Sequence, residues 1–392
     1  MKDGYVLVDA DTHVLEPPDL WDNYLEKRYQ DRPLRVGRVD EGDQIIIAGQ
    51  PSRLAAHALA FTNGMGKTVS QTSRENYHDN ADLGTRNGAE RYEHTRQTGV
   101  DYMVTLPSLA LVWTSEVSDP DLLIAYCRAY NRWLVEYSAD SKGSAVPIAT
   151  ITLEDPHAAA VEVERAINDG CKGVWIPHTT PSFRSHGNPD FDPFWAKVQD
   201  MDVPVIMHPA MERPEMSLHR RWGDLGAKDS VAGFGRWYLS VVSVQTSQMA
   251  LANLFQWALF DRFPNLRFAM IEAAAGWLPY MVHKMEAALD TSDGEALDLK
   301  ERPTYYFKKN VFIAADADEP GYEWLVETVG ADQLFWGSDY PHFDHTANWM
   351  EMVFQRTSRL AEEDRRKVLG LNALKFWNLP VPAGAELAGA GR

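Results

Sequence analysis

Short apolar runs recur along the chain, and each is followed by charged residues, proline or glycine. Eight of these runs have the length and the β-branched or aromatic content of a strand. They span residues 5–11, 101–107, 144–151, 172–178, 203–209, 266–273, 310–316 and 333–341. The runs are nearly continuous in apolar residues, which is typical of strands covered on both faces.

Segments with helical spacing lie between most of the runs. The segment 155–169 opens with Asp155 as a cap and Pro156 at the first helical position, and 119–140 opens in the same way. Strands that alternate with helices predict a parallel sheet, and eight such units predict an α/β fold of the (β/α)8 TIM-barrel type. The alternative is a doubly wound open sheet, but no glycine-rich turn follows the first run.

An insertion of about residues 30–95 interrupts the connection after the first predicted strand. It begins with a β-hairpin that turns at Asp40–Asp43 and continues as a polar loop. In a barrel, this position lies at the active-site end, so we expect a lid or an oligomer contact there. The sequence predicts one metal-dependent barrel domain over residues 1–379 and a disordered tail over 380–392.

Composition narrows the class of protein. The chain has 392 residues and a net charge of −18, which disfavours a nucleic-acid partner. Its two cysteines, Cys127 and Cys171, form no motif, so neither a disulfide framework nor a Cys-x-x-Cys site is expected. The N-terminus lacks a signal-peptide pattern, and the uncharged segment 239–260 is too rich in Ser and Gln for a membrane span. We therefore expect a cytoplasmic protein with no membrane partner, in which 239–260 is a buried helix or the contact of a homodimer.

Residues typical of metal sites follow the predicted strands. They are Asp11, His13, His178, His208, Glu272, Asp316 and Asp339. The carboxyl ends of barrel strands meet at one face, so these side chains are expected to converge. Asp11 and His13 are two residues apart, which places both on the same side of a strand. A single Asp-x-His is weak evidence by itself, because such residues also occur in turns and caps.

Several motifs in order resemble the amidohydrolase superfamily, in the branch that contains aminocarboxymuconate-semialdehyde decarboxylase. They are "VDADTHVLEP", "VPVIMHP", "FDRFPNLRFAMIEAAAGWLP", "LFWGSDYPH" and "VLGLNALKFWNL". The resemblance implies a TIM barrel with a catalytic divalent metal. It places Asp11 and His13 at the His-x-His pair of the family and His208 at a ligand histidine. Asp339 matches an aspartate that is a ligand or a general base.

Two departures from the family replace imidazole by carboxylate. Asp11 stands at the first histidine of His-x-His, and Glu272 stands where the family often has a histidine. Glu16 is a further candidate oxygen ligand, although it could cap the next helix instead, and Glu272 could pair with an arginine. A set of Asp11, His13, Glu16, His208, Glu272 and Asp339 favours iron or manganese over zinc, and it has enough ligands for one or two ions.

Other residues are candidates for binding a small-molecule substrate. His178 could shape a pocket, and Trp113 and Trp175 could line it for a ring, although ordinary packing explains them equally well. Arg184, or the pair Arg220 and Arg221, could hold a carboxylate. His342 and His345 follow Asp339, and one of them could orient a ligand, move a proton or touch substrate.

Three functions fit these residues. The first is a hydrolase or a non-oxidative decarboxylase acting on a hydrophobic, ring-containing carboxylate. In it, His208 anchors the metal, Asp339 serves as base or acid, and His342 shuttles a proton. The second is a nonheme diiron monooxygenase, resembling the TIM-barrel enzymes that hydroxylate a terpenoid acid or thioester. The third is a non-catalytic binding barrel, which the polar residues at so many strand ends disfavour.

Overall fold

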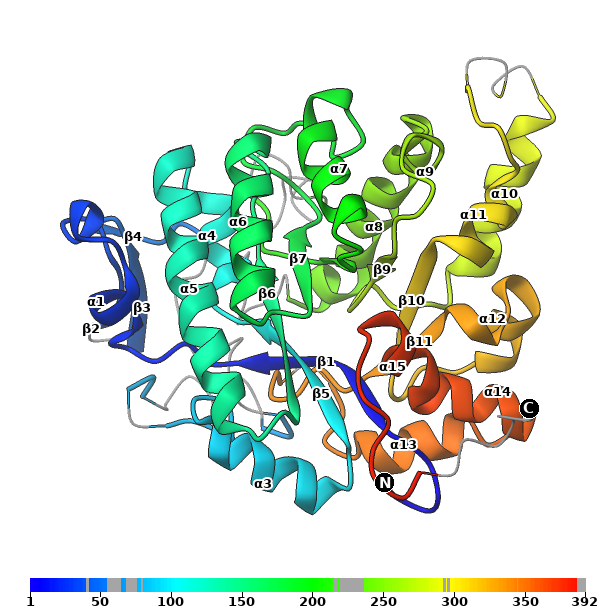
Figure 1. Ribbon diagram of the computed structural model, residues 1–392, viewed down its shortest axis with the longest axis horizontal. Helices are drawn as coiled ribbons and strands as arrows, with labels where there is room; N and C mark the ends of the chain where they lie inside the picture. The colour runs from blue at the N-terminus through cyan, green and yellow to red at the C-terminus, as the bar shows by residue number, and fades with distance from the viewer. Residues whose placement is uncertain are drawn as a thin grey trace.

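Eight parallel strands form the centre of the molecule (Figure 1), as the sequence predicts. The computed structural model describes residues 1–39, 42–54, 65–67, 76–78, 80–213, 218, 236–291, 294, 297–343 and 345–385. The strands are neighbours in chain order: β1 (Val8–Val14), β5 (Tyr102–Pro107), β6 (Ala145–Thr150), β7 (Gly173–Pro177), β8 (Val205–His208), β9 (Phe268–Met270), β10 (Val311–Asp316) and β11 (Leu334–Gly337). This order never reverses, so the doubly wound alternative is wrong.

The two outer strands, β1 and β11, meet and nearly close the sheet into a barrel. A parallel bridge joins Thr12 to Tyr340. His13 N–H donates to Tyr340 O at 2.7 Å, and Asp339 N–H donates to Asp11 O at 2.9 Å. The seam of the barrel is therefore made by the residues that the sequence places in the metal site.

Helices surround the strands (Figure 1). The longer ones are α3 (Gly88–Thr98), α5 (Pro120–Asp140), α6 (Pro156–Asp169), α7 (Asp192–Asp200), α8 (Arg236–Gln256), α10 (Leu278–Leu289), α12 (Tyr322–Val329) and α13 (Trp349–Arg356). The shorter ones are α1 (Leu20–Tyr24), α4 (Ala110–Glu116), α9 (Leu259–Arg262), α11 (Pro303–Lys309), α14 (Glu362–Arg366) and α15 (Asn372–Phe376). The predicted cap of α6 is confirmed, because the Asp155 side chain accepts from His157 N–H and Ala158 N–H before Pro156.

The insertion contains a small antiparallel sheet of β2 (Leu34–Val39), β3 (Gly42–Ile47) and β4 (Gln50–Pro51), which lies at one edge of the molecule in Figure 1. The predicted hairpin is confirmed, with Val39 paired to Gly42. This turn is tighter than Asp40–Asp43, and residues 40–41 lie outside the described part. The predicted range 30–95 also takes in the start of α3, the helix that leads into β5.

Later parts of the insertion contact the carboxyl ends of β1 and β11, the end where the sequence predicts it. Leu15 N–H donates to Thr85 O, and Met65 N–H donates to Pro341 O, both at 2.9 Å. The Tyr340 hydroxyl donates to Leu83 O at 3.0 Å. Residues 55–64, 68–75 and 79 of the insertion lie outside the described part, as do residues 386–392 of the predicted tail.

The uncharged segment 239–260 forms most of α8 and then α9. Three of its large apolar side chains are exposed, with Val241 at 51%, Met249 at 57% and Trp257 at 39%. Its other face is buried through Leu251 and Leu254. Among the described residues, no helix is long and apolar enough to cross a membrane. Both cysteines are free, as expected.

Candidate metal centre

A β-bulge shapes the first wall of the site. The register of β1 against β5 shifts between Asp9 and Thr12, which inserts an extra residue beside Asp11. Asp9 braces this bulge, because its buried carboxylate accepts from Asp11 N–H at 3.2 Å and from Ser338 N–H at 3.0 Å. Burial raises the pKa of Asp9 to about 7. Asp11 and His13 face the same side as predicted, with 3.3 Å between Asp11 Oδ1 and His13 Nε2.

Two candidate ligands lie beyond the strands, where the sequence places them at strand ends. Strand β9 ends at Met270 and β11 at Gly337, which makes the predicted strands 266–273 and 333–341 too long. Glu272 and Asp339 both adopt the left-handed backbone conformation, with φ of 53° and 57°. This conformation is uncommon outside glycine and costs about 1–3 kcal/mol per residue, so the surrounding contacts must impose it. Each turn aims its carboxylate inward rather than along the barrel wall.

The glutamate turn is fixed by a second carboxylate. Glu319, in the loop after β10, accepts from Ala275 N–H at 2.8 Å and from Gly276 N–H at 2.5 Å. It also accepts from Asp316 N–H at 3.3 Å. Glu319 therefore ties the turn that carries Glu272 to the end of the next strand.

Ligand atoms of seven residues converge over the strand ends. Three overlapping groups each lie within 4.8 Å: Asp11, His13, His208 and Glu272; His13, Asp339 and His342; Glu272, Asp339 and His345. His208 Nε2 lies 2.7 Å from Glu272 Oε2 and 3.7 Å from Asp11 Oδ1. His13 Nε2 lies 3.1 Å from Asp339 Oδ1. Residues far apart in sequence are brought together as the barrel reading expects, and their roles as ligands stay predictions.

The two central histidines are oriented by backbone carbonyls. His13 Nδ1 lies 2.8 Å from Pro107 O, and His208 Nδ1 lies 2.6 Å from Pro209 O. A carbonyl oxygen can only accept, so each Nδ1 carries a proton. In the neutral rings, the Nε2 lone pairs then point at carboxylate oxygens. Histidine ligands of metals are held in this way by a partner on the opposite ring nitrogen.

The donor set fits a divalent cation. Within the described residues, several buried atoms of the cluster have no hydrogen-bond partner: Asp11 Oδ1, His13 Nε2, His208 Nε2, Asp339 Oδ1 and Asp339 Oδ2. Buried polar atoms are rarely left without a hydrogen bond, and here lone pairs face lone pairs. A divalent cation bound among these residues would satisfy lone pairs that otherwise face one another. Mixed imidazole and carboxylate donors suit metals such as manganese, iron or zinc.

The buried, closely spaced charges of the centre shift the pKa values of its residues. Burial alone would lower the pKa of His13, but its interactions with the nearby carboxylates of Asp11 and Asp339 outweigh burial and hold that pKa well above its usual value. Burial raises the pKa of Glu272, and the charge of Asp339 adds to the rise. For Asp339, burial is outweighed by His342 and His345, so its pKa lies well below the usual range.

Glu16 lies in none of the three groups. Its buried carboxylate accepts from Leu109 N–H at 2.9 Å and from Ala110 N–H at 3.3 Å, at the start of α4. Burial raises its pKa to about 7. Its contacts match the capping alternative, although the helix that it caps is α4 rather than the next one along the chain.

The predicted substrate-binding residues are spread more widely. Trp175 is fully buried in β7, with its ring 6.3 Å from that of His208. His178 Nδ1 accepts from Ala210 N–H at 3.0 Å, which leaves Nε2 to donate to Glu212 at 3.2 Å. Trp113 packs edge-on against Trp21 in the core, as the packing alternative expects.

Arg184 pairs with a neighbouring carboxylate. Its Nη2 lies 2.5 Å from Asp190 Oδ2, and its guanidinium lies over the ring of Phe191. Arg220 and Arg221 lie outside the described residues. A role for Arg184 in holding substrate stays a prediction.

Sequence reasoning missed three residues that shape the centre. Arg91, in α3, is fully buried and donates to Gly84 O at 3.0 Å, to the Tyr137 hydroxyl at 2.8 Å and to the carbonyl of His13. Gly337 lies so close to Asp11 that a Cβ atom on it would be 2.4 Å from the Asp11 Cβ. Glu319 is the third. No short motif marks these residues, because their partners are distant in sequence.

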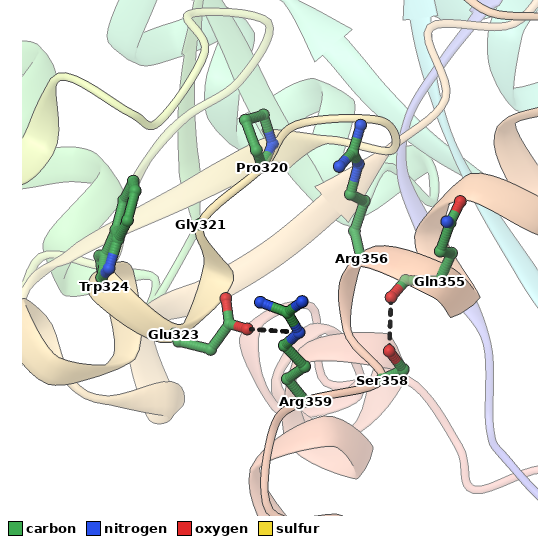
Figure 2. Close-up of a pocket in the computed structure, with 8 residues that line it drawn as sticks. All are labelled: Pro320, Gly321, Glu323, Trp324, Gln355, Arg356, Ser358 and Arg359. Carbon is green, nitrogen blue, oxygen red and sulfur yellow. Dashed lines mark hydrogen bonds and ion pairs between the residues drawn. The ribbon is translucent and has the colours of Figure 1, made fainter.

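A surface pocket of about 490 Å³ lies between the start of α12 and the end of α13. Figure 2 shows Trp324, Glu323 and Arg359 around it, and Arg359 Nε is 3.9 Å from Glu323 Oε1. None of its lining residues belongs to the three ligand groups. The pocket is therefore separate from the candidate metal centre.

Comparison with known proteins gives a consistent result. A family model described as Amidohydrolase matches residues 8–379. A gamma-resorcylate decarboxylase from Rhizobium sp. strain MTP-10005 is 27% identical over 306 residues, covering 72% of this chain and 84% of that protein.

Two solved structures share the fold. An amidohydrolase from Mycobacterium avium subsp. paratuberculosis superposes with a TM-score of 0.79 at 20% identity, over 95% of this chain and 99% of that one. A dihydroxybenzoic acid decarboxylase from Polaromonas sp. JS666, with bound manganese and 2-nitroresorcinol, gives a TM-score of 0.67 at 18% identity, over 96% and 97%. These comparisons support neither the diiron monooxygenase subgroup nor the preference for iron.

Proposed function

The chain belongs to the amidohydrolase family, a family of metal-dependent enzymes, and from this premise we propose that it is a non-oxidative decarboxylase of hydroxylated aromatic carboxylates. The observation that carries the proposal is the set of buried imidazole and carboxylate atoms over the strand ends. The similarity to gamma-resorcylate decarboxylase supports the substrate class. Membership of an enzyme family also argues against the non-catalytic barrel.

The metal would be held by Asp11, His13 and His208, with Glu272 and Asp339 beside them. When bound, a divalent cation acts as a Lewis acid toward the oxygens of the substrate and orients its carboxylate. We favour manganese, because a similar decarboxylase binds it. Hydrolysis stays the alternative reaction, and no observation on this chain favours it over decarboxylation.

The remaining residues handle the proton. In decarboxylation, the bond between the ring carbon and the carboxylate breaks, its electron pair stays on the ring carbon, and carbon dioxide leaves. The ring carbon then takes one proton, so no oxidant is needed. The pair of Asp339 and His342 supplies this proton, since His342 Nδ1 lies 2.8 Å from Asp339 Oδ1. His342 Nε2 lies 3.2 Å from the Ser108 hydroxyl. This contact gives a path along which the proton can be replaced after each reaction.

The site also excludes water and positions a ring. Asp11, His13, His208 and Asp339 are each at most 2% exposed. The indole of Trp175 lies against His208 and offers an apolar surface next to the cation. We expect His178 and Arg184 to contribute to substrate binding, and we retain the predictions of a homodimer and of a cytoplasmic location.

The test is direct. Protein freed of metal with a chelator and reloaded with Mn²⁺ is incubated with a panel of aromatic carboxylates that includes gamma-resorcylate, and released carbon dioxide is measured. We expect release that depends on metal and is lost in His208→Ala and Asp339→Asn. A His157→Gln variant, changed at an exposed residue of α6 that belongs to none of the three ligand groups, serves as the control. Metal-loaded protein that releases no carbon dioxide from any member of the panel would refute the proposal.

A further inference from the structure

We infer that the centre holds a second divalent cation, bound by Glu272, Asp339 and His345, beside the cation that the proposed function requires. The inference rests on that proposed function and extends it. It starts from the third ligand group, in which one atom from each of these residues lies within 4.8 Å of the others. His345 belongs to neither of the other groups, and His13 and His208 do not belong to this one.

Asp339 is built to face two centres. Its Oδ1 lies 3.1 Å from His13 Nε2, on the side of the first cation. Its Oδ2 lies 2.7 Å from His345 Nδ1, on the other side. The side chain is 1% exposed, and neither oxygen has a hydrogen-bond partner in the described part of the chain. A buried carboxylate that offers one oxygen to each of two groups is suited to bridge two cations.

Glu272 takes a similar position. Its Oε2 is 2.7 Å from His208 Nε2 in the first group, and it also belongs to the third group. Its side chain is 20% exposed, against 0% for His208, so it lies at the outer edge of the centre. The left-handed turn at Glu272 and its brace through Glu319 hold the carboxylate between the two groups.

His345 is oriented from its far side. Asp316 Oδ1 lies 3.8 Å from His345 Nε2, which favours the proton on that nitrogen and leaves Nδ1 facing Asp339. Asp316 ends β10, so the orienting carboxylate comes from the strand next to β11. Asp316 therefore stands beside His345 as the backbone carbonyls of Pro107 and Pro209 stand beside His13 and His208. In each case, the other ring nitrogen faces the centre.

Charge supports the same conclusion. Asp11, Glu272 and Asp339 carry three negative charges when ionised, and one divalent cation leaves this buried set negative. A second divalent cation removes the excess. The outer site has two carboxylates and one imidazole, and His345 is 17% exposed, so it should bind more weakly than the inner site.

Metal counting tests this independently of activity. Chelator-treated protein is dialysed against increasing Mn²⁺, and bound manganese is measured by mass spectrometry, with electron paramagnetic resonance to detect coupling between ions. We expect two ions per chain, the second weaker and spin-coupled to the first. His345→Gln should weaken the second ion by about 10- to 100-fold or more and leave one tight ion.

Two further variants serve as controls for the assignment of the second ion to His345. Asp316→Asn should weaken the second ion less than His345→Gln does, because it only orients the imidazole. His157→Gln should leave both ions in place. One ion per chain at saturation, or an unchanged second ion in His345→Gln, would overturn the inference while leaving the decarboxylase proposal intact. No bound manganese at all would instead refute the proposed function.

Discussion

Gly337→Ala should disable the metal centre by moving Asp11. The added Cβ would lie 2.4 Å from the Asp11 Cβ, whereas ordinary contacts of Cβ atoms begin at 3.4 Å. The two backbones must therefore separate by about 1 Å, and Asp11 with them. A misplacement of about 1 Å can cost about 100-fold in rate. Overpacking of this kind costs about 1–3 kcal/mol of folding stability.

The assay pairs this variant with Gly173→Ala. Gly173 lies at the other end of the barrel, where an added Cβ would be 3.0 Å from Pro204 O. Manganese affinity, kcat/KM and Tm are measured for both variants. We expect both to lose some stability, and only Gly337→Ala to lose at least 10-fold in metal affinity. Wild-type metal affinity in Gly337→Ala would refute this reasoning. It would show either that Asp11 is not a ligand or that β1 and β11 separate without displacing the Asp11 carboxylate.

Three further outcomes follow from the structure. Arg91→Met should lower the free energy of unfolding by about 3 kcal/mol in urea titrations, because it leaves buried acceptors, among them the His13 carbonyl, without a donor; a loss under about 0.5 kcal/mol would contradict this reading. His186 is buried, and burial lowers its pKa to about 3, so the unfolded chain binds the proton first and stability falls as pH drops from about 6.5 toward 3. Between pH 7 and pH 5, the free energy of unfolding should fall by about 2 kcal/mol less in His186→Phe than in the wild type. Parallel curves of unfolding free energy against pH for the two proteins would disprove this. Removing the metal with a chelator should lower Tm, since a ligand at 100 times its Kd stabilises the folded state by about 2.7 kcal/mol, and an unchanged Tm would argue against a bound cation.

The sequence predicts the barrel well because its signals are local. Each buried strand is an apolar run of a few residues, and the caps of α5 and α6 are short motifs that work through neighbouring atoms. The convergence of Asp11, His13 and His208 follows from one rule, that the carboxyl ends of barrel strands share a face.

What the sequence does not predict depends on contacts between distant residues. The left-handed turns at Glu272 and Asp339 are imposed by their surroundings, and neither residue type signals them. The bulge beside Asp11 needs the opposing strand to be defined. Glu16 has the composition of a ligand, but the backbone N–H groups that occupy it come from a loop 93 positions away. Trp113 is distinguished from a pocket residue only by its packing against Trp21.

The closure of the barrel at Thr12 and Tyr340 means that the candidate metal centre is assembled only when the first and last strands of the sheet meet. Ser338 N–H donates to Asp9 across 329 positions, and Asp339 enters the centre from the same segment. A nascent chain still lacking its last strand already contains Asp11, His13 and His208, but it has neither the seam that fixes the bulge nor the carboxylate that faces His13. We therefore expect a metal at this centre to be held fully only after the segment that carries Asp339 has joined the barrel.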